Sequence, residues 1–286
     1  SSIAHELGAI AFRLNNFSDA IAWWQVCLAF SSNDLPLLRQ VAQAYLGSGD
    51  IASASLLYQQ LLDRDPDDLD TIFLLADLFR RQGDLNRSQR IFEQILEREP
   101  RHVESLVSLA RVSQEQGKPQ ETMTRSFRAL DVDPNQTDAL EVLAWAHQQL
   151  LEVKAAIEVY TRITQLKPGD PEPQHRLAIL YRDTGQYDLA RKAMTAAIYH
   201  SPKDPRYFNT LGTVYSLQGL FDEAEASFNY ALQLDPEFGE AYANFGFALM
   251  QAGEKNKARP YLEKANELLE EDSELTLSIK CTLDLF

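Results

Sequence analysis

A strict 34-residue spacing of prolines limits the folds open to this chain more than any other feature of its sequence. Half of its 12 prolines follow this spacing: Pro66, Pro100, Pro134, Pro168, Pro202 and Pro236. A fixed period of about 20 to 50 residues indicates a repeat architecture, in which each repeat is one small supersecondary unit. We therefore divide the 286 residues into eight repeats and a tail: 1–34, 35–68, 69–102, 103–136, 137–170, 171–204, 205–238, 239–272 and 273–286.

Two positions in every repeat hold only small side chains, where position means the place counted from the start of the repeat. Position 8 reads Gly8, Ala42, Ala76, Ala110, Ala144, Ala178, Gly212 and Gly246, and position 20 reads Ala20, Ala54, Ser88, Thr122, Ala156, Ala190, Ala224 and Ala258. Small side chains are needed where two helices cross at a short distance. Apolar residues recur around both positions at helical spacing, so each repeat predicts two amphipathic helices, A and then B.

Turn and cap residues support this division. Position 15, between the two helices, is glycine in six repeats and Asn15 in another, and both residue types readily adopt the left-handed conformation that ends a helix. Leu151 is the exception at this position. Position 34 supplies aspartates that predict N-caps for the helices that follow: Asp34, Asp68, Asp170 and Asp204.

The repeats resemble the tetratricopeptide repeat (TPR) family. Repeat 205–238 matches the family pattern most fully, at Phe208, Leu211, Gly212, Tyr215, Ala224, Phe228 and Pro236. The resemblance covers residues 1–272 and implies an all-α fold, a right-handed TPR superhelix (α-solenoid) of stacked antiparallel helix hairpins with a C-terminal capping helix.

Two repeats depart from the family pattern. Repeat 103–136 has Ser113 and Pro119 where aromatic residues are usual, and repeat 137–170 has His147 in place of a tyrosine and lacks the turn glycine. We expect these two repeats to pack less regularly than the others.

The tail, residues 273–286, fits two structures. As helix A of a ninth unit it places Ile279 and Leu283 in the core and leaves Leu277, Cys281 and Leu285 partly exposed. Its strict alternation of apolar and polar residues is also typical of a strand that pairs with another chain. Self-association through residues 273–286 is therefore one expectation for this chain.

Composition narrows the classes of partner. The chain has 42 acidic and 27 basic residues and a net charge of −15, which disfavours nucleic acid because phosphate backbones are repelled. No apolar run reaches the roughly 18 to 20 residues of a membrane span, so we expect no membrane insertion. The start lacks a signal-peptide pattern, which favours a soluble, cytoplasmic protein over a periplasmic one, although a chain that opens at Ser1 leaves the compartment open.

Residue patterns for catalysis and metal binding are missing from the sequence. The five histidines are scattered without HExxH spacing, the two cysteines stand at opposite ends of the chain, and there is no glycine-rich phosphate loop. We expect no catalytic residues, no metal, no cofactor and no enzymatic activity.

The family resemblance implies a concave groove lined by positions 2, 5, 9 and 12 of helix A. In the middle repeats these positions combine apolar, basic and acidic side chains, which are the predicted site: Phe73, Asp77, Arg80, Val107, Arg111, Glu141, Trp145, His175, Ile179 and Arg182. Aromatic and arginine residues are enriched at the centres of protein interfaces. The alternative is that Trp145, Phe73 and Ile179 fill space in the core.

Position 2 carries an acid in five repeats: Asp70, Glu104, Asp138, Glu172 and Glu240. Either these acids stabilise the first helical turn through the helix dipole, or they form an acidic lip that prefers basic ligands. The carboxylate-clamp residues of the family's chaperone adaptors are missing from any three consecutive repeats, and only Asn244 represents the family's asparagine ladder.

The sequence thus predicts a non-catalytic scaffold or adaptor that binds a protein or peptide segment in the groove. Two alternatives remain open at this point, a bacterial secretion or pilus-assembly chaperone of the TPR type and a self-assembling structural scaffold.

Overall fold

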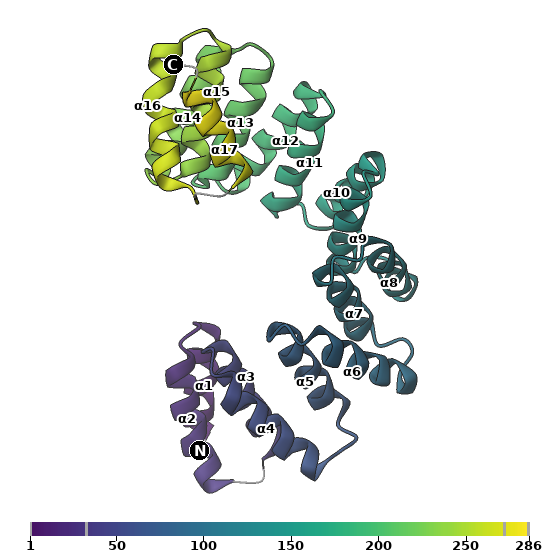
Figure 1. Cartoon of the computed structure of the whole chain (residues 1–286). Coiled ribbons are helices and arrows are strands. Elements are labelled where there is room, and N and C mark those ends of the chain that lie inside the picture. The colour runs from purple at the N-terminus through teal and green to yellow at the C-terminus, as the bar shows by residue number, and fades with distance from the viewer. Residues whose placement is uncertain (1, 32–33, 271–272, 285–286) are drawn as a thin grey trace. The chain divides into compact units, whose positions relative to one another are not determined.

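Helices joined by short turns make up the computed structural model, which describes residues 2–31, 34–270 and 273–284. No strand occurs among these described residues, and each predicted repeat contains the two expected helices (Figure 1). The all-α fold of successive helix hairpins is therefore confirmed. Odd-numbered helices are the A helices and even-numbered helices are the B helices.

The helices fall into two compact units, residues 1–150 and 151–286, and the division lies within repeat 137–170. The N-terminal unit contains α1 (Ser2–Arg13), α2 (Phe17–Phe30), α3 (Leu35–Gly47), α4 (Ile51–Arg64), α5 (Leu69–Arg81), α6 (Leu85–Arg98), α7 (Val103–Glu115), α8 (Pro119–Val132) and α9 (Thr137–Gln149). The C-terminal unit contains α10 (Val153–Leu166), α11 (Pro171–Asp183), α12 (Tyr187–His200), α13 (Pro205–Leu217), α14 (Phe221–Leu234), α15 (Gly239–Gln251), α16 (Lys255–Leu268) and α17 (Glu274–Leu283).

The small side chains at positions 8 and 20 lie where helix A crosses helix B, and all of them are buried. Their size is required because position 24 of helix B is bulky in most repeats. A Cβ atom added to Gly212 would lie 2.8 Å from the ring of Phe228, and one added to Gly246 would lie 2.6 Å from the side chain of Leu262. The predicted close crossing of the two helices is confirmed.

Repeat 103–136 differs from the others at this crossing. Its position 24 is Ser126, which is buried where the other repeats place a large side chain. The neighbouring Arg125 is nearly buried, donates to the backbone oxygen of Leu109 over 3.1 Å, and forms ion pairs with Glu121 and Glu93. Polar groups thus replace part of the apolar core in this repeat.

The turns between helices A and B have the predicted left-handed residue. The glycine at position 15 has a positive φ in all six repeats that contain it, and Asn15 has a φ of 57°. Leu151 adopts the same conformation, with a φ of 58°, although its side chain makes this conformation unfavourable. The turn geometry therefore persists where the glycine is missing. The four predicted N-cap aspartates each accept a hydrogen bond from a backbone N–H of the helix that follows.

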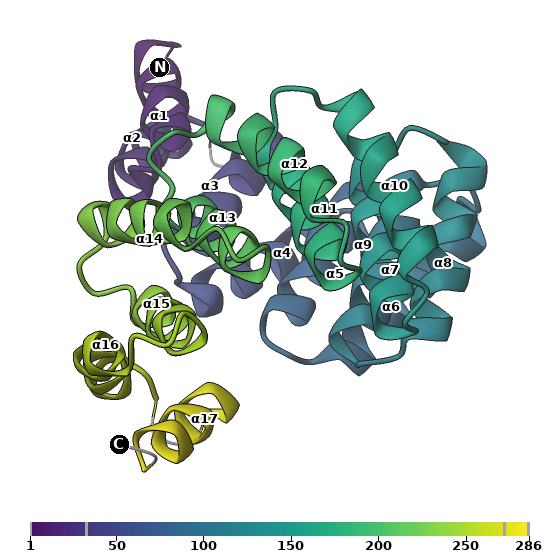
Figure 2. The ribbon, with the colours of Figure 1, turned by 90° about the horizontal axis from the view of Figure 1, so that it is seen from above.

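The tail forms the helix α17, which lies beside α16 in the C-terminal unit (Figure 2). Ile279 is fully buried against Ala243, Leu262 and Ala265, and Leu283 packs at the edge of the same cluster. Leu277 and Cys281 are exposed, as expected for a helix, whereas Leu285 lies outside the described residues. The helical alternative is confirmed for residues 274–283, and the strand alternative is wrong there, because α16 offers an apolar helix surface and no sheet edge.

Candidate binding groove

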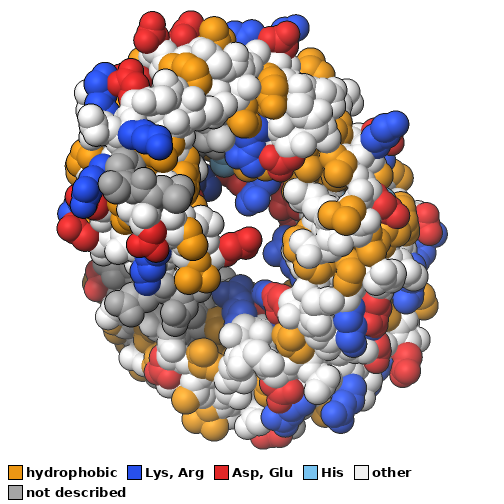
Figure 3. All heavy atoms as spheres, turned by 45° about the horizontal axis from the view of Figure 1, so that its top comes forward, with side chains coloured by type: hydrophobic (Ala, Val, Ile, Leu, Met, Phe, Trp, Pro, Cys, Tyr) orange, Lys and Arg blue, Asp and Glu red, His pale blue; other side chains and the backbone are white. Residues whose placement is uncertain are grey.

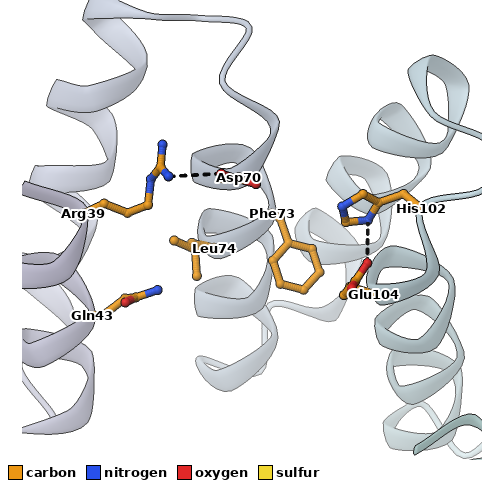
Figure 4. Close-up of a pocket in the computed structure, with 7 residues that line it drawn as sticks. All are labelled: Arg39, Gln43, Asp70, Phe73, Leu74, His102 and Glu104. Carbon is orange, nitrogen blue, oxygen red and sulfur yellow. Dashed lines mark hydrogen bonds and ion pairs between the residues drawn. The ribbon is translucent and has the colours of Figure 1, made fainter. Parts of the chain in front are cut away.

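Two hollows lie on the A helices of the N-terminal unit. The first has a volume of about 360 Å³ and is lined by residues from α3, α5 and the start of α7: Arg39, Gln43, Asp70, Phe73, Leu74, His102 and Glu104 (Figure 4). Most of these residues occupy positions 2, 5, 6 and 9 of their repeats. The hollow therefore lies on the helix face that the sequence assigned to the groove.

Arg39 is held at one side of this hollow by acidic and hydroxyl oxygens. Its Nη2 donates to Asp68, its Nη1 donates to Asp70 over 3.1 Å, and its Nε donates to the hydroxyl of Thr71 over 3.2 Å. Burial opposes ionisation of Asp68, but hydrogen bonds from Thr71 and Arg39 outweigh that effect, so the pKa of Asp68 is lowered. Because Asp68 also caps α5, the guanidinium fixes α3 to the start of the next A helix.

Phe73 forms the apolar wall of the first hollow. Its ring centroid lies 5.5 Å from that of Phe92 in the core and 5.8 Å from the imidazole of His102. The side chain is half-buried, so one part of the ring belongs to the core and another part faces the hollow. Phe73 therefore packs partly in the core, and its role in binding a partner stays a prediction.

The second hollow, of about 340 Å³, lies further along α5 and α7 and is lined by Arg80, Arg111, Gln114, Glu115, Glu141 and Val142. Arg80 bonds Asp77 over 2.7 Å and also pairs with Glu115 on the next A helix. Burial lowers the pKa of Arg80, but the hydrogen bonds and charges of Asp77 and Glu115 outweigh burial and raise it. Arg111 pairs with Asp138 over 3.2 Å.

Acids at position 2 pair with arginines in three places. Asp70 pairs with Arg39, Asp138 pairs with Arg111, and Glu172 pairs with Arg176, at position 6 of its own helix, over 2.9 Å. All three predicted arginine anchors have acidic partners within the chain: Arg80, Arg111 and Arg182.

Of the other predicted residues in the N-terminal unit, Val107 is only 6% exposed and packs in the core beside Phe92. Trp145, on α9, is half-buried, and Glu141 lies one helical turn before it at the edge of the second hollow. Val107 cannot present an apolar surface to a ligand, and we leave it out of the site proposed below.

In the C-terminal unit, His175 is 7% exposed and packs against the ring of Tyr207, with centroids 4.9 Å apart. Its Nε2 lies 2.9 Å from the hydroxyl of Thr210, and its Nδ1 is buried without a hydrogen-bond partner. Burial lowers the pKa of His175 to about 4, and the positive charges of Arg206 and Arg176 contribute. His175 is a neutral core residue near pH 7, so the proposed site omits it as well.

Ile179 and Arg182 are also in the C-terminal unit, on the same helix as His175. Ile179 is half-buried, and Arg182 pairs with the adjacent Asp183 over 2.7 Å. The predicted ten residues are therefore divided between the two units, and the hollows of the N-terminal unit bring together Phe73, Arg80, Arg111 and Glu141.

A family model described as the tetratricopeptide repeat matches residues 45–112, 152–212 and 217–276, which is well over half of the chain. The chain belongs to the tetratricopeptide repeat family.

Solved structures of tetratricopeptide repeat proteins share this fold. A protein from Parabacteroides merdae has a TM-score of 0.65 and 19% identity, over 88% of this chain and 98% of that one. PilF of Pseudomonas aeruginosa has a TM-score of 0.63 and 19% identity, over 72% and 94% of the two chains. YrrB, described as a TPR protein with an unusual peptide-binding site, has a TM-score of 0.52 and 18% identity, over 66% and 97%. None of the curated protein sequences compared with the chain matches it.

Several residues of the first hollow are missing from the predicted site: Arg39, Gln43, Leu74 and His102. The signal was present, because Arg39 and Gln43 occupy positions 5 and 9 of repeat 35–68, but the prediction concentrated on the more apolar repeats. Leu74 and His102 occupy positions 6 and 34, and only the packing of successive repeats turns them towards the hollow.

Within residues 2–31, 34–270 and 273–284, no three or more His, Cys, Asp or Glu side chains are grouped so that they could hold a metal ion. In the same residues, no helix has both the length and the apolar character that crossing a membrane requires. Basic and acidic side chains are interspersed on the face seen in Figure 3, and neither sign dominates it.

Proposed function

We propose that this tetratricopeptide repeat protein is a non-catalytic scaffold or adaptor that binds a segment of another protein in the two hollows of its N-terminal unit. The observation that carries the proposal is the position of these hollows. Both are formed by the faces of consecutive A helices, α3 to α9, and they share α5 and α7. An extended segment that follows these helices meets both hollows in turn.

The lining of the hollows suits a peptide better than a small molecule. The first hollow combines an apolar wall with polar side chains, and the second is lined almost entirely by polar side chains, whereas small-molecule sites are usually more enclosed and more apolar. Phe73 and the half-buried Trp145 offer apolar surface for affinity. The glutamines Gln43 and Gln114, one in each hollow, can donate to and accept from a peptide backbone.

Similarity to YrrB supports the class of ligand, since that protein is described as having a peptide-binding site. At 18% identity the similarity shows a shared fold alone. The proposal for this chain therefore rests on its own residues.

Peptide display with site-specific cross-linking tests the proposal. Twelve-residue random peptides would be selected on the full chain, and a photoreactive phenylalanine analogue would be placed in turn at Gln43, at Gln114 and at the control site Leu56. Leu56 is an exposed apolar residue of the B helix α4, away from both hollows. Selected peptides are expected to cross-link at Gln43 and Gln114 and not at Leu56.

Cross-linking confined to Leu56, or a selection that enriches no peptide, would contradict the proposed groove.

A further inference from the structure

The first hollow differs from the second in its balance of charge, and this difference indicates the chemistry of what it binds. Two carboxylates, Asp70 and Glu104, line it against the single positive charge of Arg39, whereas two arginines and two glutamates line the second hollow. The hydrogen bonds of Arg39 and His102 show how far these two residues are already engaged.

Arg39 is already engaged with acidic groups. All three nitrogens of its guanidinium donate to oxygens of Asp68, Asp70 and Thr71. These bonds use three of its five N–H groups, and an incoming carboxylate or phosphate would meet the negative charges of Asp70 and Glu104.

His102 serves the backbone of α7. Its Nδ1 accepts a hydrogen bond of 3.2 Å from the backbone N–H of Ser105, as the N-cap of α7. The carboxylate of Glu104 lies 3.8 Å from that same nitrogen, which is too long for a hydrogen bond.

Both lining carboxylates reach solvent, although Asp70 is also paired with Arg39. The side chain of Asp70 is 75% exposed and that of Glu104 is 66% exposed. In Figure 4 the ring of Phe73 lies between Arg39 and Glu104, and Leu74 continues the apolar wall beside it. A carboxylate next to an aromatic face and an aliphatic wall matches a side chain with a cationic end and an apolar stem.

We propose that the hollow between α3, α5 and α7 binds an arginine or lysine side chain of the partner segment. Its cation lies against the Phe73 ring and pairs with Glu104 and Asp70, while its aliphatic stem packs on Phe73 and Leu74. This inference rests on the proposed function, because it names the chemistry that one part of the groove selects.

The test uses the full chain and the peptides that cross-link at Gln43, labelled for fluorescence anisotropy. Each basic residue of a peptide would be replaced in turn by citrulline, or by norleucine where the residue is lysine. We expect one such replacement to weaken binding about tenfold, since one charge-assisted contact with an aromatic neighbour contributes about 1 to 2 kcal/mol. The double variant Asp70→Asn with Glu104→Gln should weaken the unmodified peptide by a similar factor and leave the neutral peptide unaffected.

Matched variants separate charge from structure. Asp70→Asn retains the N-cap Asp68, so α5 and the contact with Arg39 stay in place. Phe73→Leu keeps apolar volume against Phe92 but removes the aromatic face, and it should weaken the arginine peptide more than the citrulline peptide. Asp63→Asn, an exposed acid of the B helix α4, is the charge control and should change neither affinity.

Each outcome decides between the two proposals. Two results would overturn the basic-residue inference and leave the groove intact. One is a set of peptides that cross-link at Gln43 but contain no basic residue. The other is an affinity that neither citrulline nor the double variant changes. Failure of every peptide to cross-link at Gln43 or Gln114 would overturn the groove itself.

Discussion

Asn244 donates a hydrogen bond of 3.0 Å from its Nδ2 to the Oδ1 of Asn209, and the two residues are 35 positions apart. One repeat and one residue make up this separation. The same offset joins His175 to Thr210 and Ser216 to Gln251. In the first two pairs position 5 of one A helix contacts position 6 of the next A helix, and in the third pair position 12 contacts position 13. These side-chain hydrogen bonds connect the A helices of successive repeats.

Truncation of Asn209 tests this connection. Asn209 is buried, so Asn209→Ala leaves the amide of Asn244 without its partner and should destabilise the chain by about 1 to 2 kcal/mol. Asn209→Ala combined with Asn244→Ala should cost less than the sum of the single changes. Urea unfolding of the four proteins of this cycle measures the coupling, and strictly additive losses would show that the bond contributes nothing.

Leu151 offers a gain in stability at the turn that lacks glycine. Its φ of 58° is strained for a leucine, and its side chain is 84% exposed, so it contributes little packing. Leu151→Gly should raise the free energy of unfolding by about 0.5 to 1 kcal/mol, which is the relief of strain less the added entropy of the unfolded chain. The reverse change at an equivalent turn, Gly185→Ala, should lower it by a similar amount. A thermal midpoint that falls for Leu151→Gly would mean that this side chain has a packing role.

The capping helix α17 should depend on one face only. Ile279 is fully buried, so Ile279→Ala should cost about 2 to 4 kcal/mol of local stability, whereas Leu277→Ala on the exposed face should change it little. Hydrogen exchange of α16 and α17 is the measurement, because a repeat protein can open at its end without unfolding elsewhere.

Self-association through the tail is tested by light scattering, with Leu277→Ala compared with the unmodified chain. Equal masses at monomer size would rule out a contribution from this residue.

Stability should fall on mild acidification because of His175. Burial lowers its pKa to about 4 in the folded chain, against a usual value of about 6.5. Above pH 6.5 the residue is neutral in both states and contributes nothing. Between pH 6.5 and 4 the unfolded chain binds a proton that the folded chain does not, so stability is lost progressively as the pH falls.

The loss approaches about 3 kcal/mol once the pH is below both pKa values. His175→Gln keeps a polar partner for Thr210 and should remove this part of the pH dependence. The comparison is best made by urea unfolding between pH 7 and 5, before most carboxylates titrate. Parallel curves for the two proteins would contradict the role of His175.

The fold could be predicted where the interactions that form it join residues close together in the sequence. Features that act within one repeat could be predicted from the sequence. They are the proline spacing, the small residues at positions 8 and 20 and the aspartate caps. The secondary structure of the tail could not be predicted in this way, since its alternating pattern fits either a helix or a strand. Packing against α16 favours the helix, because burial of Ile279 requires a helical face.

By itself the sequence determined the repeat length, the two helices of each repeat, the turn positions and the helix face on which the two hollows lie. The tertiary structure alone decided which groove side chains remain available to a ligand. Arg39, Arg80 and Arg111 find acidic partners on neighbouring helices, and Val107 and His175 are buried. The physical reason is that helical periodicity fixes the direction of each side chain within its own helix. Charge pairing and burial depend on distances to residues about 30 positions away, which are set only when the repeats stack.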